Sequence, residues 1–160
     1  MYDLTDFQSY QDYFKAIAES HVALGEGSFL FGDDQVAVNE GKVWKGKKLW
    51  LEPYQPVTLN DQLSDNYLQE KKGSLWIGGA PPNTKFQARF DFFKDCEVIV
   101  TDIISKMLKD RSEELLITRL TSYKFGMGEL TFSATSMVGC RFDFSFQDPS
   151  GFAYDEDKWT

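Results

Sequence analysis

The sequence predicts an α+β fold in which a mainly antiparallel β-sheet packs against two α-helices, one of them long. Residues 84–109 carry large apolar side chains at helical spacing, and these are Phe86, Phe90, Phe93, Val100, Ile104 and Met107. Near the end of the chain, apolar residues alternate with polar ones as in a strand with one buried face, and these are Cys140, Phe142, Phe144 and Phe146. An apolar helix stripe and an apolar sheet face can share one core, so the two patterns together favour a scaffold.

The first helix is predicted to begin at Thr5. Thr5 and Gln8 have the spacing of a capping box, in which a hydroxyl and an amide satisfy the free N–H groups of the first turn. Apolar residues follow at helical spacing, and they are Phe7, Tyr10, Phe14 and Ile17. Gly25 is expected to close this helix, because glycine readily adopts the left-handed conformation of helix ends.

The region after the first helix has the composition of β-strands. Residues 27–31 and 35–38 are predicted as short strands, and residues 42–52 as a hairpin or pair of strands with a turn at Gly46. A brief buried strand is predicted at residues 75–77, because a short apolar run is bounded there by glycines.

Residues 53–72 are predicted as an extended loop or insertion, because they combine two prolines with scattered apolar residues. Leu59, Leu63 and Tyr67 have the spacing of a brief helix, whereas residues 57–59 could equally be extended. A long loop in a compact domain often has a task such as contacting a neighbour. The alternative is a mobile surface insertion.

The second helix is expected to begin at Thr84, which makes a second capping-box pattern with Gln87. A helix over residues 84–109 would be roughly 39 Å long at about 1.5 Å per residue.

After this helix, the sequence predicts closing strands. Residues 115–125 are rich in strand-forming side chains, residues 126–128 predict a turn or bulge, and residues 130–134 alternate again. Gly139 is expected to break the run before the phenylalanine-rich strand, which residues 148–151 end.

The length and composition of the chain indicate one domain over residues 1–151, followed by an acidic tail at residues 152–160. The 160 residues are 42% hydrophobic and 16% aromatic, which argues for a packed core and against general disorder. The net charge of −8 disfavours binding to nucleic-acid backbones or anionic lipid. The sequence has no signal-peptide pattern and no run of membrane-spanning length, so we expect no membrane partner.

The densest basic cluster consists of Lys42, Lys45, Lys47 and Lys48. It could contact nucleic acid, but a solvated hairpin edge protected by lysines is the commoner meaning of such a pattern.

No residue pattern predicts catalysis, a metal or a cofactor. The chain has two cysteines, Cys96 and Cys140, at core-type positions where a thiol is inert. A Cys–His nucleophile pair would need His21, the single histidine, beside one of them. The acidic residues between 33 and 40 lack the spacing of a calcium loop. We therefore predict a protein that is not an enzyme.

Aromatic and apolar residues of the central region, together with Trp159 near the end of the chain, are candidates for subunit contacts. Trp44, Trp50 and Trp76 could line a ligand pocket, but tryptophans on neighbouring strands more often lie in a core or an interface. The exposed end of a long helix together with open strand edges would favour self-association by sheet extension. The candidate interface residues are Trp44, Trp50, Tyr54, Leu59, Leu63, Tyr67 and Trp159.

The order of predicted elements is a capped helix, strands with a long loop, a long helix and closing strands. In this order the chain resembles the tail-terminator and tail-completion proteins of long-tailed bacteriophages. Residues 98–110 are similar to the helix that packs under the sheet in that family. Residues 138–146 are similar to its final strand, which starts at a glycine and alternates aromatic residues.

The resemblance implies a structural, ring-forming subunit, a hexamer in that family, that caps the tail tube at the head–tail junction. It implies tail-tube and neck or connector proteins as partners, DNA that passes through without specific binding, and a place in the virion after assembly in the host cytoplasm. An acidic surface suits a DNA channel because like charges repel. Another neck component or part of a contractile injection particle remains open. The alternative is a small soluble ligand- or protein-binding module with an aromatic pocket.

Overall fold

The structure is a computed structural model that describes residues 1–33, 46–61, 67–83, 85–116, 118, 120–126 and 137–148. Within these residues the chain forms two helices and six strands. In order they are α1 (Phe7–Ser20), β1 (Phe29–Phe31), β2 (Lys48–Leu51), β3 (Gln55–Asp61), β4 (Tyr67–Gly79), α3 (Phe86–Ser112), β5 (Leu120–Gly126) and β6 (Val138–Asp148). The predicted α+β class is confirmed.

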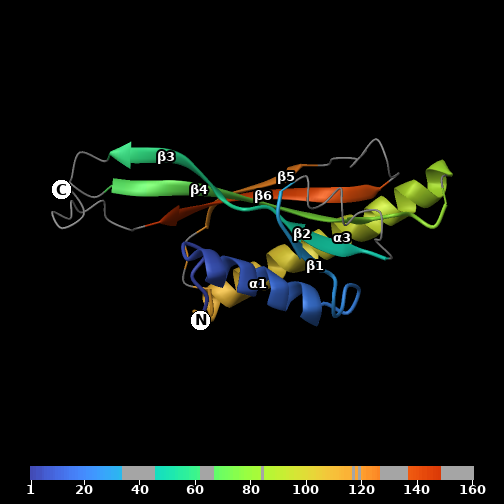
Figure 1. Cartoon of the computed structure of the whole chain (residues 1–160), viewed down its shortest axis with the longest axis horizontal. Helices are drawn as coiled ribbons and strands as arrows, with labels where there is room; N and C mark the ends of the chain where they lie inside the picture. The colour runs from blue at the N-terminus through green and yellow to red at the C-terminus, as the bar shows by residue number, and fades with distance from the viewer. Residues whose placement is uncertain are drawn as a thin grey trace.

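The strands form one mixed, six-stranded sheet in the order β1-β2-β4-β6-β5, with β3 paired to β4 beside this path (Figure 1). β1 and β2 are parallel, and the other described pairs are antiparallel. β4 organises the sheet, because β3 and then β2 pair along one of its edges while β6 pairs along the other.

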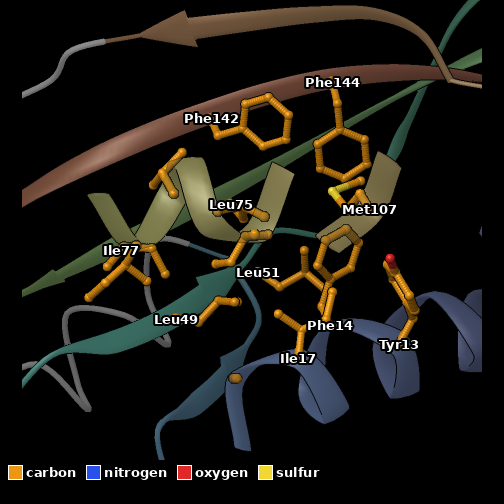
Figure 2. Close-up of a cluster of buried hydrophobic side chains, with 14 of the residues drawn as sticks. Tyr13, Phe14, Ile17, Leu49, Leu51, Leu75, Ile77, Met107, Phe142 and Phe144 are labelled. Carbon is orange, nitrogen blue, oxygen red and sulfur yellow. The ribbon is translucent and has the colours of Figure 1, made fainter. Parts of the chain in front are cut away.

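Both helices pack on the same face of this sheet, α1 against β1 and β2 and α3 against β4 and β6 (Figure 1). Figure 2 shows side chains from both helices and from β2, β4 and β6 meeting in one core. Its buried members include Phe14, Ile17, Leu49, Leu51, Leu75, Ile77, Met107, Phe142 and Phe144. The shared core predicted for the helix stripe and the apolar strand is confirmed.

The strict alternation in β6 gives the expected two faces. Cys140, Phe142, Phe144 and Phe146 are all buried, and the polar residues between them are half-buried. β6 ends at Asp148, where the sequence predicted its end. Gly139 does not break the strand as predicted, because it pairs with Gly78 inside the β4–β6 ladder.

The prediction of a loop or insertion at residues 53–72 is wrong for residues 55–61 and 67–72. Residues 55–61 and 67–72 are the paired strands β3 and β4, and the extended alternative for residues 57–59 is correct. A helix through Leu59 and Tyr67 is also wrong, because both belong to strands. Residues 67–72 are extended despite their polar sequence, because this first part of β4 has backbone partners in β3 on one side and in β6 on the other.

The strand predicted at residues 75–77 is part of the much longer β4, and glycine explains the difference. A Cβ on Gly73 would lie 2.5 Å from Cζ of Phe144 and 2.8 Å from Oη of Tyr10. A Cβ on Gly79 would lie 2.2 Å from the carbonyl oxygen of Gly46. Gly73 is therefore a close-approach position inside the strand, whereas Gly79 is its last residue.

The capping box predicted for α1 is wrong by one residue. Asp6 is the N-cap, and its Oδ2 accepts a 2.7 Å hydrogen bond from the backbone N–H of Ser9. The Thr5 hydroxyl instead donates to Oδ1 of Asp3 at 2.7 Å. The helix ends at Ser20, and Gly25, with φ of +81°, lies in the turn that follows.

α3 is 27 residues long, about 40 Å at about 1.5 Å per residue. Its N-cap is Lys85, which makes no side-chain cap, and Gln87 donates forward to Asp91 at 2.8 Å, so the second capping box is wrong. Thr84 lies outside the described residues.

The buried stripe of α3 is rotated from the predicted one. It consists of Cys96, Ile99, Val100, Ile103, Met107 and Asp110. Val100 and Met107 were predicted correctly, whereas Phe86 is 80% exposed and Phe90 is 42% exposed. The first turns of α3 extend beyond the strands of the sheet (Figure 1), and this explains why the rings of Phe86 and Phe90 are not covered.

A buried hydrogen bond joins the two helices. Tyr13 Oη donates to Oδ2 of Asp110 at 3.1 Å, and Lys106 pairs with Oδ1 of the same carboxylate. Burial, and next the Asp110 charge, raise the pKa of Tyr13 well above its ordinary value. The phenol therefore stays a neutral donor to Asp110.

The strand predicted at residues 115–125 begins later, at Leu120, and Leu116 makes an isolated parallel bridge to Tyr2. Gly126 is the last residue of β5, and the predicted elements at residues 35–38 and 130–134 lie outside the described residues. Of the described helices, none is long and apolar enough to cross a membrane.

Candidate functional site

Polar and aromatic side chains gather on the sheet face opposite the helices. They alternate with core residues along β2, β4 and β6, because successive strand residues point to opposite faces. We call this group the outer-face cluster, and its members are Trp50, Glu52, Ser74, Trp76, Arg141 and Asp143.

The two tryptophans of the cluster stack on each other, with ring centroids 6.0 Å apart and an interplanar angle of 13°. Trp50 is 1% exposed and packs with Met137 and Leu30. Its Nε1 donates to the carbonyl of Gly32 at 2.8 Å, and Nε1 of Trp76 donates to Oε1 of Glu52 at 2.8 Å. Both indole N–H groups are therefore satisfied within the chain.

Arg141 is the centre of the polar part of the cluster. Its Nε donates to Oδ1 of Asp143 at 2.7 Å, and its Nη2 donates to Oγ of Ser74 at 2.9 Å. Nη2 also lies 3.6 Å from Oε2 of Glu52, and the guanidinium lies 5.1 Å from the centre of the Trp76 ring. One cation thus joins β4, β6 and the residue that follows β2.

The Asp143 carboxylate is held ionised by this arrangement. Partial burial would raise its pKa, but hydrogen bonds from Ser74 and Arg141 and the positive charges of Arg141 and Lys72 outweigh that effect. The pKa of Asp143 is therefore lowered.

The geometry of the cluster suits a structural clamp better than a catalytic centre. Ser74 Oγ donates to Asp143 at 2.6 Å and accepts from Arg141, and the lowered pKa of Asp143 makes its carboxylate a weak base for activating a hydroxyl. His21 lies elsewhere, with Nε2 3.4 Å from Oδ2 of Asp102 on α3.

Neither cysteine is activated. Burial raises the pKa of the Cys96 thiol to about 12 and that of the Cys140 thiol to about 11. Both thiols are therefore protonated at neutral pH, where a nucleophile would need the thiolate.

The described lysines of the basic cluster bind within the chain. Lys47 Nζ donates to Oδ2 of Asp95 at 2.8 Å, and Lys48 Nζ donates to the carbonyl of Gly27 at 3.0 Å. Lys42 and Lys45 lie outside the described residues. In the part of the chain that the structure describes, no group of three or more His, Cys, Asp or Glu side chains could hold a metal ion.

The predicted interface residues do not form one described surface. Trp50 is buried, which leaves its indole no exposed area for a subunit contact. Tyr54 packs against the core, and its hydroxyl donates to the carbonyl of Thr5 at 3.0 Å. Leu59 and Tyr67 lie on β3 and β4, and only their backbone is described. Outside the described residues are Trp44, Leu63 and Trp159.

An exposed aromatic surface on α3 was missed by the sequence analysis. The rings of Phe86 and Phe90 stack with centroids 6.1 Å apart, and Lys94 Nζ lies 4.7 Å from the centre of the Phe90 ring. We call these three residues the α3 aromatic patch. The spacing of the two phenylalanines had suggested the core-facing stripe.

The prediction from sequence also missed the outer-face cluster, but for a different reason. Arg141 and Asp143 alternate with the core phenylalanines, which does indicate a shared face. Their partners Ser74 and Glu52 come from distant segments, and only the strand register brings them together.

No protein-family model, curated protein or solved structure matches this chain.

Proposed function

We propose that the protein is a structural subunit that associates with copies of itself into a ring at the head–tail junction of a long-tailed phage or a related tail-like particle. In this role it caps the tail tube and joins it to the neck. Its chemistry is recognition and packing rather than catalysis.

The observation that carries the proposal is the order and layering of the elements. A helix, a set of strands, a long helix and closing strands build one sheet that is covered by helices on one face. This is the arrangement that the resemblance to tail-terminator proteins implies. The β3–β4 hairpin replaces the predicted loop as the segment between the first strands and the long helix.

Two further features support a structural role. The two thiols that the sequence singled out are protonated at neutral pH, and Arg141 of the outer-face cluster is bound by Asp143 and Ser74. The α3 aromatic patch exposes large apolar surface, which commonly marks a contact with another protein.

The test is the mass of the protein in solution, measured by light scattering behind size exclusion over a wide concentration range. The same protein is then mixed with purified tail-tube protein and with assembled tubes, and the complexes are inspected by negative-stain electron microscopy. We expect a closed oligomer, formed either alone or on the end of a tube. An unrelated acidic monomer of similar size serves as the control for non-specific adhesion.

A ring seen at one tube end would support the proposal. A protein that stays monomeric at every concentration and does not bind assembled tubes would contradict it. Binding along the whole length of the tube would contradict the terminal position.

A further inference from the structure

The α3 aromatic patch has the composition of a docking surface. Phe86 is 80% exposed and Phe90 is 42% exposed, yet their rings are held parallel, with an interplanar angle of 9°. Lys94 lies over Phe90 on the side toward the helix centre. The patch therefore offers two flat apolar rings beside a cation.

The charge around this patch differs from that of the whole chain. Residues 85–94 contain three basic residues and one acidic residue, while the chain as a whole has a net charge of −8. The first turn of α3 contains no acidic residue, and its N-cap, Lys85, makes no side-chain cap. The positive end of the helix dipole adds to the same sign. A ligand with aromatic and acidic groups would complement this end of α3.

The chain itself contains a segment of that chemistry. Residues 152–160 carry three consecutive acidic residues, and the aromatic residues around them are Phe152, Tyr154 and Trp159. We propose that the α3 aromatic patch of one copy binds residues 152–160 of a second copy. This deepens the proposed function, on which it rests, by naming a contact between neighbouring subunits.

The position of β6 indicates that residues 152–160 bind the patch of a second copy rather than the patch of their own chain. β6 begins at Val138, opposite Gly79 near the start of α3, and ends at Asp148, opposite Gln69. Figure 1 shows the end of β6 and the start of α3 at opposite ends of the molecule. The 11 residues of β6 span roughly 35 Å at about 3.3 Å per residue.

The reach of the segment leads to the same conclusion. Asp157 lies nine residues after Asp148, which allows at most about 32 Å at about 3.6 Å per residue. That is less than the length of β6 alone, and α3 begins past the far end of β6 (Figure 1). The acidic run therefore reaches the patch of a neighbour more readily than the patch of its own chain.

A contact between opposite ends of the molecule is heterologous, because the two surfaces differ. Heterologous contacts repeat from copy to copy and close into rings when the rotation allows it. The proposed contact is therefore of the kind that a ring requires.

Binding is tested first in trans, with a fluorescein-labelled peptide of residues 149–160 and a protein truncated after Gly151. Fluorescence anisotropy should show saturable binding that weakens as salt is raised. The double substitution Phe86→Ser with Phe90→Ser should weaken it at least tenfold. Val98→Ser, at an exposed apolar position elsewhere on α3, should leave it unchanged. A peptide of the same composition in scrambled order is the ligand control.

The second-copy assignment is tested by mixing. The truncated protein keeps the patch, and the full chain with Phe86→Ser and Phe90→Ser keeps the segment. Together, above the dissociation constant of the peptide, they should form a one-to-one complex that neither forms alone. Circular dichroism of each variant checks that it is folded.

The outcomes separate this contact from the proposed function. No saturable peptide binding, or binding indifferent to the double substitution, overturns the contact even if rings form. Peptide binding without a mixed complex overturns the contact between two copies, because the segment of a whole chain then does not reach the patch of a neighbour. A confirmed contact in a protein that forms no ring, alone or on tubes, retains the contact and contradicts the proposed function.

Discussion

At the scale of single residues, Asp143 occupies a polar strand position on the outer face of the sheet and nevertheless stabilises the fold. It accepts hydrogen bonds from Ser74 and Arg141, and its pKa is lowered despite partial burial. The pKa of Asp143 is lower in the folded state than in the unfolded state. Its contribution to stability is therefore fully present at pH values above the unfolded-state pKa. The contribution is lost as pH falls through the folded-state pKa.

Asp143→Asn should lower the free energy of unfolding at neutral pH by about 1 kcal/mol or somewhat more, because Arg141 loses the nearer of its two acidic partners while solvent screens part of the interaction. The difference from the native protein should shrink as pH falls below about 3.9, the ordinary pKa of aspartate. Urea unfolding between pH 7 and pH 3 measures both effects. Asp95→Asn, which removes a more exposed ion pair with Lys47, is the matched control and should change stability less. If the difference in the free energy of unfolding stays constant with pH, the ionised Asp143 carboxylate does not have the stabilising role assigned to it.

Gly73 is the second residue whose role is visible only in the structure. An alanine Cβ there would meet the ring of Phe144, which is 1% exposed, and the hydroxyl of Tyr10. We expect Gly73→Ala to cost about 1–3 kcal/mol, as overpacking does in other cores. Chemical denaturation measures the loss.

A double-mutant cycle distinguishes this clash from a general effect on the strand. Phe144→Leu shortens the opposing side chain, so Gly73→Ala should cost less in the Phe144→Leu background than in the native one. Equal costs in the two backgrounds would show that the Phe144 ring is not the obstacle.

At the scale of elements, α3 separates a core-facing stripe from an exposed flank. Ile103→Ala should lower the free energy of unfolding by about 2–5 kcal/mol, because Ile103 is fully buried. Phe86→Ala should change it by less than about 0.5 kcal/mol, although phenylalanine is larger, because its ring is mostly exposed. Thermal and urea unfolding of both variants provide the comparison. A larger loss for Phe86→Ala would restore the stripe predicted from sequence.

The elements that were predictable from sequence are those with a strong local pattern. The alternation of phenylalanines located β6 and its buried face, and helical spacing located both helices. Local sequence patterns were insufficient where two neighbouring residues fit one role equally well and where partners distant in sequence determine the structure. Thr5 and Asp6 are both good N-cap types, and only the bond to Ser9 distinguishes them. The β3–β4 hairpin was hidden because its polar sequence is extended through partners distant in sequence.

The candidate sites were less predictable than the fold, for a related reason. The outer-face cluster depends on strand register, which places Trp50 against Trp76 and Arg141 against Trp76 across three strands. The α3 aromatic patch depends on how far the helix extends beyond the sheet. Neither quantity is encoded in the spacing of residues along one segment.

At the scale of the whole molecule, one buried core connects both helices to the sheet. Cys96 on α3 and Cys140 on β6 both belong to this core, together with residues of α1, β2 and β4. Because no described element has a core of its own that excludes the others, the described part of the chain should unfold in one cooperative step.

The two thiols provide the probe for that expectation. Both are buried, and burial raises the pKa of each, so labelling by a thiol reagent at neutral pH should need global unfolding. We expect the labelling of both cysteines to follow the same urea dependence as the far-UV circular dichroism of the helices and the near-UV signal of the tryptophans. Cys96→Ser and Cys140→Ser variants report each thiol separately. If Cys96 reacts at urea concentrations where the Cys140 signal and the sheet persist, α3 detaches as an independent unit. In that case the single core does not act as one cooperative structure.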